Sequence, residues 1–138
     1  MAAVVVDTDV VPFLFKRDAR AESYRRHLDG KLSVISFMTV AELYRWSLDR
    51  NWGSTRCAAM EEHLHNFVVY PFHRDLCRKW AEASHSAKLK GRRINCADAW
   101  VAATALLHGI PLVTHNRTHF AGVDNLVVIS ESEGSLTA

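Results

Sequence analysis

The sequence has few of the residues that build disulfide-stapled or membrane-bound proteins. Its three cysteines, Cys57, Cys77 and Cys96, lie far apart and form no Cys-x-x-Cys pair. That number and spacing exclude a disulfide framework and a zinc-finger site. No apolar run approaches the roughly 20 residues that span a bilayer, and no basic leader precedes the apolar N-terminal stretch. We therefore expect a cytoplasmic protein that is neither exported nor inserted into a membrane.

Neither sign of charge predominates. Lys and Arg number 17 and Asp and Glu 15, which gives a formal net charge of +2 and an isoelectric point near 8.5. This weakly basic balance permits a nucleic-acid partner, but only local clusters of charge would argue for one. Repeats, linkers and low-complexity segments are also lacking. Because 49% of the 138 residues are hydrophobic, we expect a single domain over residues 1–130, followed by a polar tail over residues 131–138.

Short apolar segments alternate with amphipathic ones along the chain. Residues 2–6 are apolar and mostly β-branched, which is typical of a strand buried on both faces in a parallel sheet. The same criteria predict further strands at 32–35, 67–70, 111–114 and 126–129, and helices at 18–28, 36–52, 55–66, 74–90 and 96–109. This alternation predicts a three-layer α/β fold with helices on both faces of a mostly parallel sheet.

Two carboxylates interrupt the apolar run "VVVDTDVV" near the start of the chain. A carboxylate buried without a partner loses several kcal/mol of solvation, so Asp7 and Asp9 need partners, water or a metal. Both follow the first predicted strand. In open α/β sheets, ligands bind outside the carboxyl ends of the strands, so these two residues lie at the expected ligand edge.

Three more polar residues are predicted at the same edge. Glu42 follows the second strand, Asp98 begins the apolar helix at 96–109, and Asn116 follows the fourth strand. Each has a structural alternative: Glu42 could complete a capping box with Thr39, Asp98 could complement the helix dipole after the Asn95 cap, and Asn116 could be a turn residue. Their coincidence on separate elements favours a shared site.

Clustered carboxylates repel one another unless a cation neutralises them. Oxygen ligands without Cys or His favour Mg²⁺ or Mn²⁺, and we expect Asp7 and Asp98 to bind this ion. Such a metal lowers the pKa of a bound water and polarises a phosphoryl oxygen, which is the chemistry of phosphodiester hydrolysis. A carboxylate beside the water would act as its base.

Basic residues cluster in "KLKGRR", just before the Asp98 helix. We expect Lys90, Arg92 and Arg93 to contact the phosphates of a polyanionic substrate beside the metal. Arg25 and Arg26 form a second pair, which we assign to an ordinary solvated surface.

Aromatic residues could stack on bases, but Trp46, Trp80 and Trp100 have apolar neighbours at helical spacing, so we assign them to the core. His115 and His119 could contact a phosphate. Surface histidines are commonly without function, and neither is included in the predicted site.

Taken in order, the segments "VVDTDVV", "SFMTVAEL" and "ADAWVAATALLHGIPLVTHNRTHF" resemble those of PIN-domain ribonucleases, specifically the VapC-type toxins of bacterial toxin–antitoxin modules. The resemblance extends from Val4 to about Ile129. It implies the catalytic residues Asp7, Glu42, Asp98 and Asn116, with Asp9 and Thr114 as accessory residues.

The same resemblance implies a PIN-like α/β/α fold and Mg²⁺- or Mn²⁺-dependent endonuclease activity on RNA. It also implies a homodimer, neutralised by a cognate antitoxin whose peptide crosses the acidic cleft. The sequence departs from the family at Asp9, commonly Asn or Ser, and at Asn116 and His119, where a fourth acid is often found. A degenerate PIN domain, acting only in dimerisation or antitoxin binding, is the alternative. A phospho-receiver domain is disfavoured, because neither "FVVYPFH" nor its surroundings provides a phosphoacceptor Asp in the right place.

Overall fold

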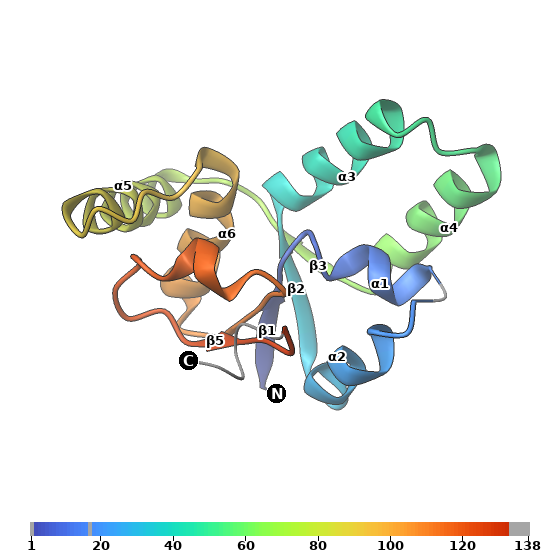
Figure 1. Cartoon of the computed structure of the whole chain (residues 1–138), viewed down its shortest axis with the longest axis horizontal. Helices are drawn as coiled ribbons and strands as arrows, with labels where there is room; N and C mark the ends of the chain where they lie inside the picture. Colours follow the sequence, from blue (N-terminus) through green and yellow to red (C-terminus); the bar gives the residue numbers. More distant parts are fainter. Residues whose placement is uncertain (1, 17, 133–138) are drawn as a thin grey trace.

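The computed structural model describes residues 2–16 and 18–132. Its centre is a five-stranded parallel sheet in the order β3-β2-β1-β4-β5 (Figure 1). The strands are β1 (Ala3–Val6), β2 (Leu32–Ser36), β3 (Val68–Tyr70), β4 (Leu112–Val113) and β5 (Val128–Ile129). The predicted α/β class with a parallel sheet is confirmed.

Helices cover both faces of the sheet (Figure 1). They are α1 (Val11–Phe15), α2 (Ala21–Leu28), α3 (Phe37–Asp49), α4 (Ser54–Leu64), α5 (Arg74–Leu89), α6 (Cys96–His108) and the 3₁₀ helix η1 (Arg117–Phe120). Capping residues determine where several of these helices begin or end. Ser36 and Asn95 accept backbone N–H bonds as N-caps, and Gly109 ends α6 at φ 63°. Within the described ranges, none of these helices has the length and apolar character needed to cross a membrane.

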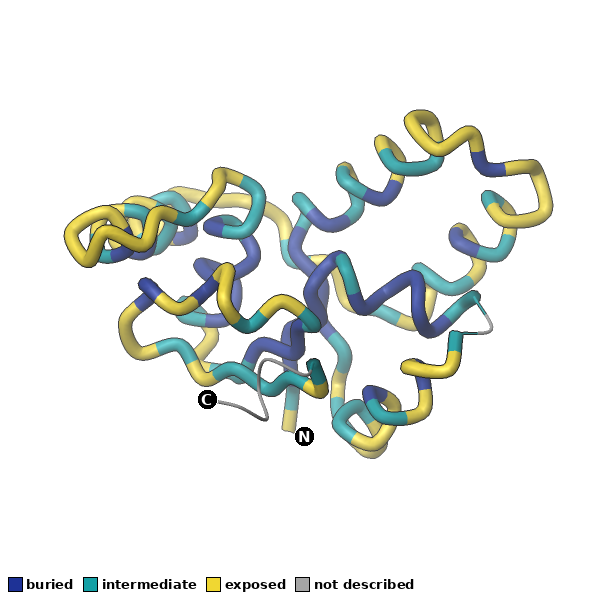
Figure 2. The backbone as a smooth tube through the Cα atoms, viewed as in Figure 1, coloured by how far each residue is buried: buried dark blue, intermediate teal, exposed yellow. Residues whose placement is uncertain are grey.

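The central strand β1 joins two separate hydrophobic clusters. Val4 and Val6 pack with residues of α1, α2, α3 and α4, whereas Val5 packs with residues of α5 and α6. Side chains of a strand alternate between faces, so a strand buried on both sides must be apolar at every position. Figure 2 shows the buried backbone running through the middle of the molecule. Burial of each valine contributes about 1.5–3 kcal/mol, and the strand is therefore a rigid base for the residues that follow it.

Two helical segments differ from the sequence-based predictions. The helix α1 was not predicted; it begins in the apolar run after Asp9, with Pro12 in its first turn. The helix predicted from residue 18 begins only at Ala21, because the Asp18 carboxylate accepts bonds from the backbone and guanidinium N–H groups of Arg20. These bonds lower the pKa of Asp18 to about 2 and hold residues 18–20 in a turn.

The tryptophans divide differently from the prediction. Trp52, which was not assigned to the core, is 9% exposed, and Trp46 is half-buried against the same cluster. Trp80 and Trp100 are also only half-buried and lie against each other, with ring centroids 5.5 Å apart. Helical spacing identified an apolar face but not its depth. Assigning Trp80 and Trp100 to the core was wrong, because neither packs in the two hydrophobic clusters of the described residues.

The chain after β5 begins by contacting the domain. Glu131 donates its backbone N–H to the Tyr24 hydroxyl and pairs through its carboxylate with His27. The predicted tail over residues 131–138 therefore starts with an attached residue. Positions 133–138 lie outside the described residues, and their assignment as a tail stays a prediction.

A glycine holds the segment after η1 against the end of α5. A Cβ atom on Gly122 would lie 2.7 Å from the backbone oxygen of Arg92 and 3.0 Å from Ala87. Gly53, at the start of α4, has no atom within 4 Å of the same position. Only a residue without a side chain lets the segment that contains Gly122 approach the end of α5 so closely.

We expect Gly122→Ser to lower the free energy of unfolding by about 1–3 kcal/mol through overpacking. The matched variant Gly53→Ser adds the same atoms in open space at an N-cap, where serine is favoured, and should not destabilise the protein. Urea unfolding of both variants tests this. Equal stabilities would show that the Gly122 contact does not constrain the fold.

Candidate active site

Asp7 is a buried carboxylate at the end of the central strand. Its side chain is 3% exposed, and its oxygens accept hydrogen bonds from the backbone N–H of Thr8 (2.8 Å) and the hydroxyl of Thr114 (2.7 Å). Thr114 follows β4, the neighbouring strand, so the pairing of β1 with β4 brings the two together. Both donors are neutral. They fix the carboxylate's orientation without compensating its charge.

Glu42 points to the same edge from α3. Its Oε1 accepts a 2.7 Å hydrogen bond from the Thr8 hydroxyl, which also lies 2.8 Å from the Thr39 hydroxyl. The capping-box alternative is wrong, because Ser36 caps α3 and Thr39 lies inside the helix. Glu42 is consequently in the second turn, not the first. The hydroxyls of Thr8 and Thr39 connect the strand end to this helix.

Asp9 and Asn116 form a pair across the site. One oxygen of Asp9, Oδ2, accepts hydrogen bonds from the Asn116 side-chain amide (2.7 Å) and the His115 backbone N–H (3.1 Å). Its other oxygen, Oδ1, is buried, and no hydrogen-bond partner is found for it in the described part of the chain. Asn116 therefore acts as a neutral donor that orients a carboxylate. The second Asp9 oxygen has no donor among the described residues, and Asp9 is close enough to Asp7 for a side-chain hydrogen bond between the two carboxyl groups, which lowers the pKa of Asp9.

Asp98 begins α6, as predicted from Asn95. The Asn95 side chain accepts the Asp98 backbone N–H at 2.8 Å, so the cap is confirmed. The Asp98 carboxylate also lies 3.3 Å from Nδ1 of His119. His119 was left out of the predicted site as an ordinary surface histidine, but η1, which was not predicted, brings it towards α6.

The four carboxylates influence one another electrostatically. Burial, followed by the charges of Asp9 and Asp98, raises the pKa of Asp7 well above its usual value. Burial also raises the pKa of Asp9, Glu42 and Asp98, and the Asp98 charge adds to the increase for the first two. The neighbouring His119 partly opposes the shift at Asp98. An ionised cluster is therefore unfavourable by itself, and a cation would relieve it.

The donor set fits a hard cation, although it is not a complete cage. Among residues 2–16 and 18–132, no three His, Cys, Asp or Glu side chains are gathered closely enough to hold a metal ion by themselves. Mg²⁺ usually binds one or two carboxylates and completes its shell with water and substrate oxygens. The unbonded Asp9 oxygen and the mutual repulsion of the carboxylates fit such an open site. That Asp7, Glu42 and Asp98 share one ion stays a prediction.

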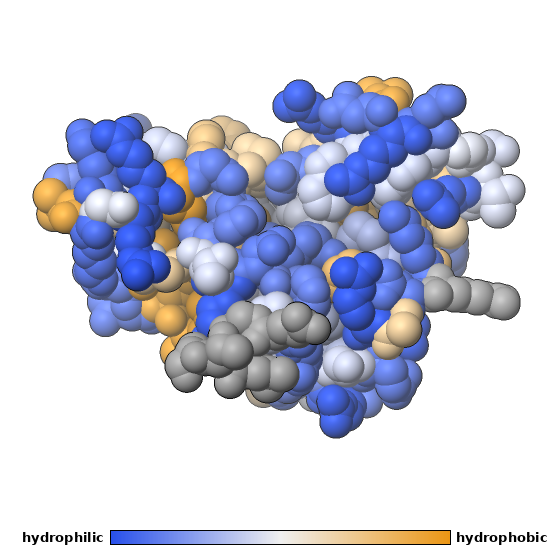
Figure 3. Space-filling model, viewed as in Figure 1, coloured by the Kyte–Doolittle hydropathy of each residue, from blue (hydrophilic) through white to orange (hydrophobic). Residues whose placement is uncertain are grey.

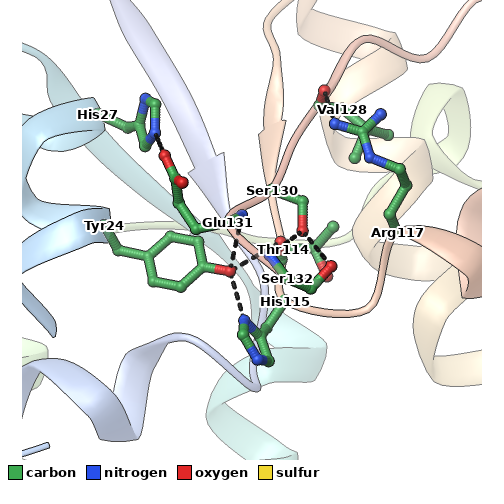
Figure 4. A network of polar contacts seen from close by, with 9 residues as sticks. All are labelled: Tyr24, His27, Thr114, His115, Arg117, Val128, Ser130, Glu131 and Ser132. Carbon is green, nitrogen blue, oxygen red and sulfur yellow. Dashed lines mark hydrogen bonds and ion pairs between the residues drawn. The ribbon is translucent and has the colours of Figure 1, made fainter. Parts of the chain in front are cut away.

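A polar network holds the turn that contains Thr114 and Asn116 (Figure 4). The buried Tyr24 hydroxyl lies 2.5 Å from Nδ1 of His115 and 3.4 Å from the Thr114 backbone oxygen. It also accepts the Glu131 N–H at 3.1 Å. Thus α2 and the segment after β5 both restrain this turn. Sequence reasoning did not identify Tyr24, and it considered His115 only as a phosphate contact, because these two residues lie 91 positions apart in the sequence.

The predicted substrate-binding residues lie in the loop between α5 and α6. Lys90, Arg92 and Arg93 are all exposed, and Lys90 is ion-paired with Asp124. The backbone N–H of Arg92 bonds to Ala87, which keeps the loop close to α5. The two arginines lead directly into the N-cap of α6. They are better placed than Lys90 to bind a phosphate.

Sequence comparison relates the chain to known ribonucleases. A family described as PIN domain matches residues 4–126. The chain is 31% identical over 133 residues to the VapC ribonuclease Y4jK of Sinorhizobium fredii, covering 88% of this chain and 94% of that protein. It is 28% identical over 127 residues to ribonuclease VapC1 of Haemophilus influenzae, covering 88% and 92%.

Structural comparison gives the same relationship. The structure of VapBC-1 from nontypeable Haemophilus influenzae matches with a TM-score of 0.76 at 25% identity, covering 93% of this chain and 97% of that chain. VapBC2 from Rickettsia felis, bound to a DNA fragment from its promoter, matches with a TM-score of 0.81 at 18% identity, covering 93% and 98%. The second likeness concerns the fold alone.

We expect Asp7→Asn to stabilise the metal-free protein at pH 7.5, because the variant removes a charge that burial and the neighbouring Asp9 and Asp98 disfavour, and these causes raise the pKa of Asp7. A carboxyl with a raised folded-state pKa favours folding below its unfolded pKa, and this contribution is lost as the pH rises through the folded pKa. The variant's advantage should therefore be small near pH 4 and grow towards neutral pH.

Urea unfolding in EDTA at several pH values measures this difference. The exposed Asp49→Asn on α3 is the control and should show little pH-dependent gain. A less stable Asp7→Asn at pH 7.5 would mean that the hydrogen bonds of the carboxylate outweigh its buried charge.

Proposed function

The chain belongs to the PIN-domain family, and from this membership we propose that it is an endoribonuclease, the toxin of a bacterial toxin–antitoxin pair. The observation that supports this most strongly is the gathering of Asp7, Asp9, Glu42 and Asp98 at the carboxyl ends of the parallel strands. Antitoxin-free protein, incubated with total cellular RNA with and without Mg²⁺ and followed by end mapping, tests the activity.

The proposed cofactor is Mg²⁺ or Mn²⁺, bound by Asp7 and Asp98 with Asp9 beside them. When bound, this ion lowers the pKa of a water and polarises a phosphoryl oxygen. The chain's own residues orient the ligands: Thr114 holds Asp7, and Asn116 holds Asp9. The Thr114 hydroxyl and the Asn116 amide are both neutral, so they orient the carboxylates without competing with the metal ion for them.

A non-catalytic PIN domain is the alternative, because Asn116 replaces a frequent fourth acid. The position of Asp9 weakens this alternative. It restores the number of carboxylates to four, and Asn116 donates to it. We therefore favour an active enzyme whose fourth carboxylate comes from the β1 end.

The proposed partners follow from the relatives. Several structural neighbours are toxin–antitoxin complexes. We propose a cognate antitoxin that lays a peptide across the acidic edge, where a basic side chain would enter the cation position, and a homodimeric toxin in the cytoplasm. Size measurements of the protein with and without a co-expressed antitoxin test these partners.

Asp98→Asn should reduce metal-dependent RNA cleavage by about 100-fold or more, because it removes a proposed metal ligand while conserving volume. Circular dichroism should remain that of the wild type. The control Asp75→Asn, an exposed residue of α5, should cleave normally. Undiminished cleavage by Asp98→Asn, free of contaminating nuclease, would refute the mechanism.

Replacing Arg92 and Arg93 with Gln should weaken RNA binding across sequences. Each lost phosphate contact removes about 0.7 from the log–log salt slope for a single strand, and the choice of cleavage site should barely change. Binding of RNA at several salt concentrations, with Ca²⁺ replacing Mg²⁺ to suppress cleavage, measures this. An unaltered slope would remove the loop from the substrate-binding surface.

A further inference from the structure

Three cations gather around two tryptophans where α1 meets the connection between α3 and α4. The Lys16 ammonium lies 4.9 Å from the Trp52 ring centroid, and the Arg56 guanidinium carbon lies 5.7 Å from the same centroid. The Arg50 guanidinium carbon lies 4.5 Å from the Trp46 ring centroid. We call Lys16, Arg50 and Arg56 the cationic patch. It lies outside the basic loop that the sequence pointed to.

The charges of the cationic patch lack direct carboxylate partners in the described residues. None of its members forms an ion pair within 4 Å in the part of the chain that the structure describes. Burial, and then the charges of Arg56 and Arg50, lower the pKa of Lys16, while Asp18 opposes this shift. Like charges held together in a free protein favour an anion that binds among them. Figure 3 shows hydrophilic side chains over the α3 and α4 region.

The patch also has a concave surface. Lys16 and Arg56 line an open hollow together with Phe15, Thr55 and Gly53. Gly53 is the N-cap of α4 and supplies no side-chain cap, so backbone N–H groups at the start of this helix add to the positive character of the hollow. Lys16 and Arg56 lie over the buried Trp52 ring, and Arg50 lies over the half-buried Trp46 ring. A ligand would therefore be recognised through its charge and not by base stacking.

The helix α1 connects the patch to the candidate active site. Arg20 contacts this helix, with its guanidinium carbon 3.9 Å from the Phe13 ring centroid, but its charge is paired with the Asp18 carboxylate. The bonds to Asp18 are the main reason that the pKa of Arg20 is raised, and the charge of Asp9 adds to this increase. The charge of Arg20 in turn lowers the pKa of Lys16. The intervening α1 has five residues, about 8 Å at 1.5 Å per residue. An extended polyanion could span both places.

We propose that the cationic patch binds phosphates of the RNA substrate a few nucleotides from the bond that is cut. This inference rests on the proposed ribonuclease function. RNA is the occupant that charge complementarity and continuity with the carboxylate edge both favour, because its backbone presents a negative charge at every nucleotide. The contact is independent of base sequence, and it adds to that of the loop between α5 and α6.

The test compares two triple variants in RNA binding with Ca²⁺ at several salt concentrations. The probe is a labelled single-stranded RNA of 16 nucleotides. Changing Lys16, Arg50 and Arg56 to Gln should lower the log–log salt slope by about 2, from about 0.7 for each lost contact. The matched control changes Arg45, Arg78 and Lys79 to Gln, which removes the same charge from residues that have carboxylate partners. Its slope should fall less.

A charge-preserving variant separates charge from folding. Lys16→Arg, Arg50→Lys and Arg56→Lys together should retain the wild-type slope, because phosphates are held here by charge. A wild-type slope for the Gln variant would overturn the proposal, as would equal reductions in the Gln and control variants. Loss of binding to poly-glutamate with an unchanged RNA slope would do so too, and would assign the patch to an acidic polypeptide.

Cleavage of RNA by the wild type is measured in parallel. Patch-dependent RNA binding without cleavage would contradict the ribonuclease proposal but support the binding surface. Cleavage of RNA, together with a salt slope that the Gln variant leaves unchanged, would support the ribonuclease proposal and contradict the binding surface. If the wild type does not bind RNA at all, both proposals fail.

Discussion

The candidate site depends on one unfavourable burial, that of the Asp7 carboxylate at the end of the central strand. β1 lies between β2 and β4, so any side chain at its carboxyl end is enclosed by neighbouring strand ends. The Thr8 backbone N–H and the Thr114 hydroxyl orient Asp7, but both donors are neutral and do not cancel its charge. Asp9 and Asp98 raise the cost further. The fold thus stores electrostatic repulsion that a bound cation would release, which is how a site can be both destabilising and functional.

Buried threonines are the means by which the fold positions these carboxylates. Thr8 and Thr39 connect the strand end to Glu42, and Thr114 donates to Asp7 while accepting the backbone N–H of Asn116. A hydroxyl can donate and accept at once, so each threonine links two elements without adding charge. A lysine or arginine in these positions would compete with the cation. This explains why the polar residues nearest to the carboxylates are mostly uncharged.

In the proposed arrangement, positive charge is kept at the periphery of an acidic centre. The loop between α5 and α6 lies on one side of the sheet, and the cationic patch lies beside α1 and α4 on the other (Figure 1). A polyanion attracted by both would have to cross the carboxylates, which favours binding only when a cation is present. Substrate affinity and metal binding would then be coupled, since each reduces the charge that opposes the other.

The sequence by itself determined the alternating α/β order, the buried β1 strand, the Asn95 cap and the acids at the sheet edge. These features follow from local patterns. Runs of β-branched residues indicate buried strands, and a polar side chain three residues before an unpaired backbone N–H indicates a helix N-cap. The carboxyl ends of parallel strands lie at the same edge of the sheet. Only the tertiary structure decided which polar residues meet. The Glu42–Thr8, His119–Asp98 and Tyr24–His115 contacts, like the cations around Trp52, join elements distant in sequence. Hydrophobic periodicity indicates which face of a helix or strand is buried, but it does not indicate which other element packs against that face.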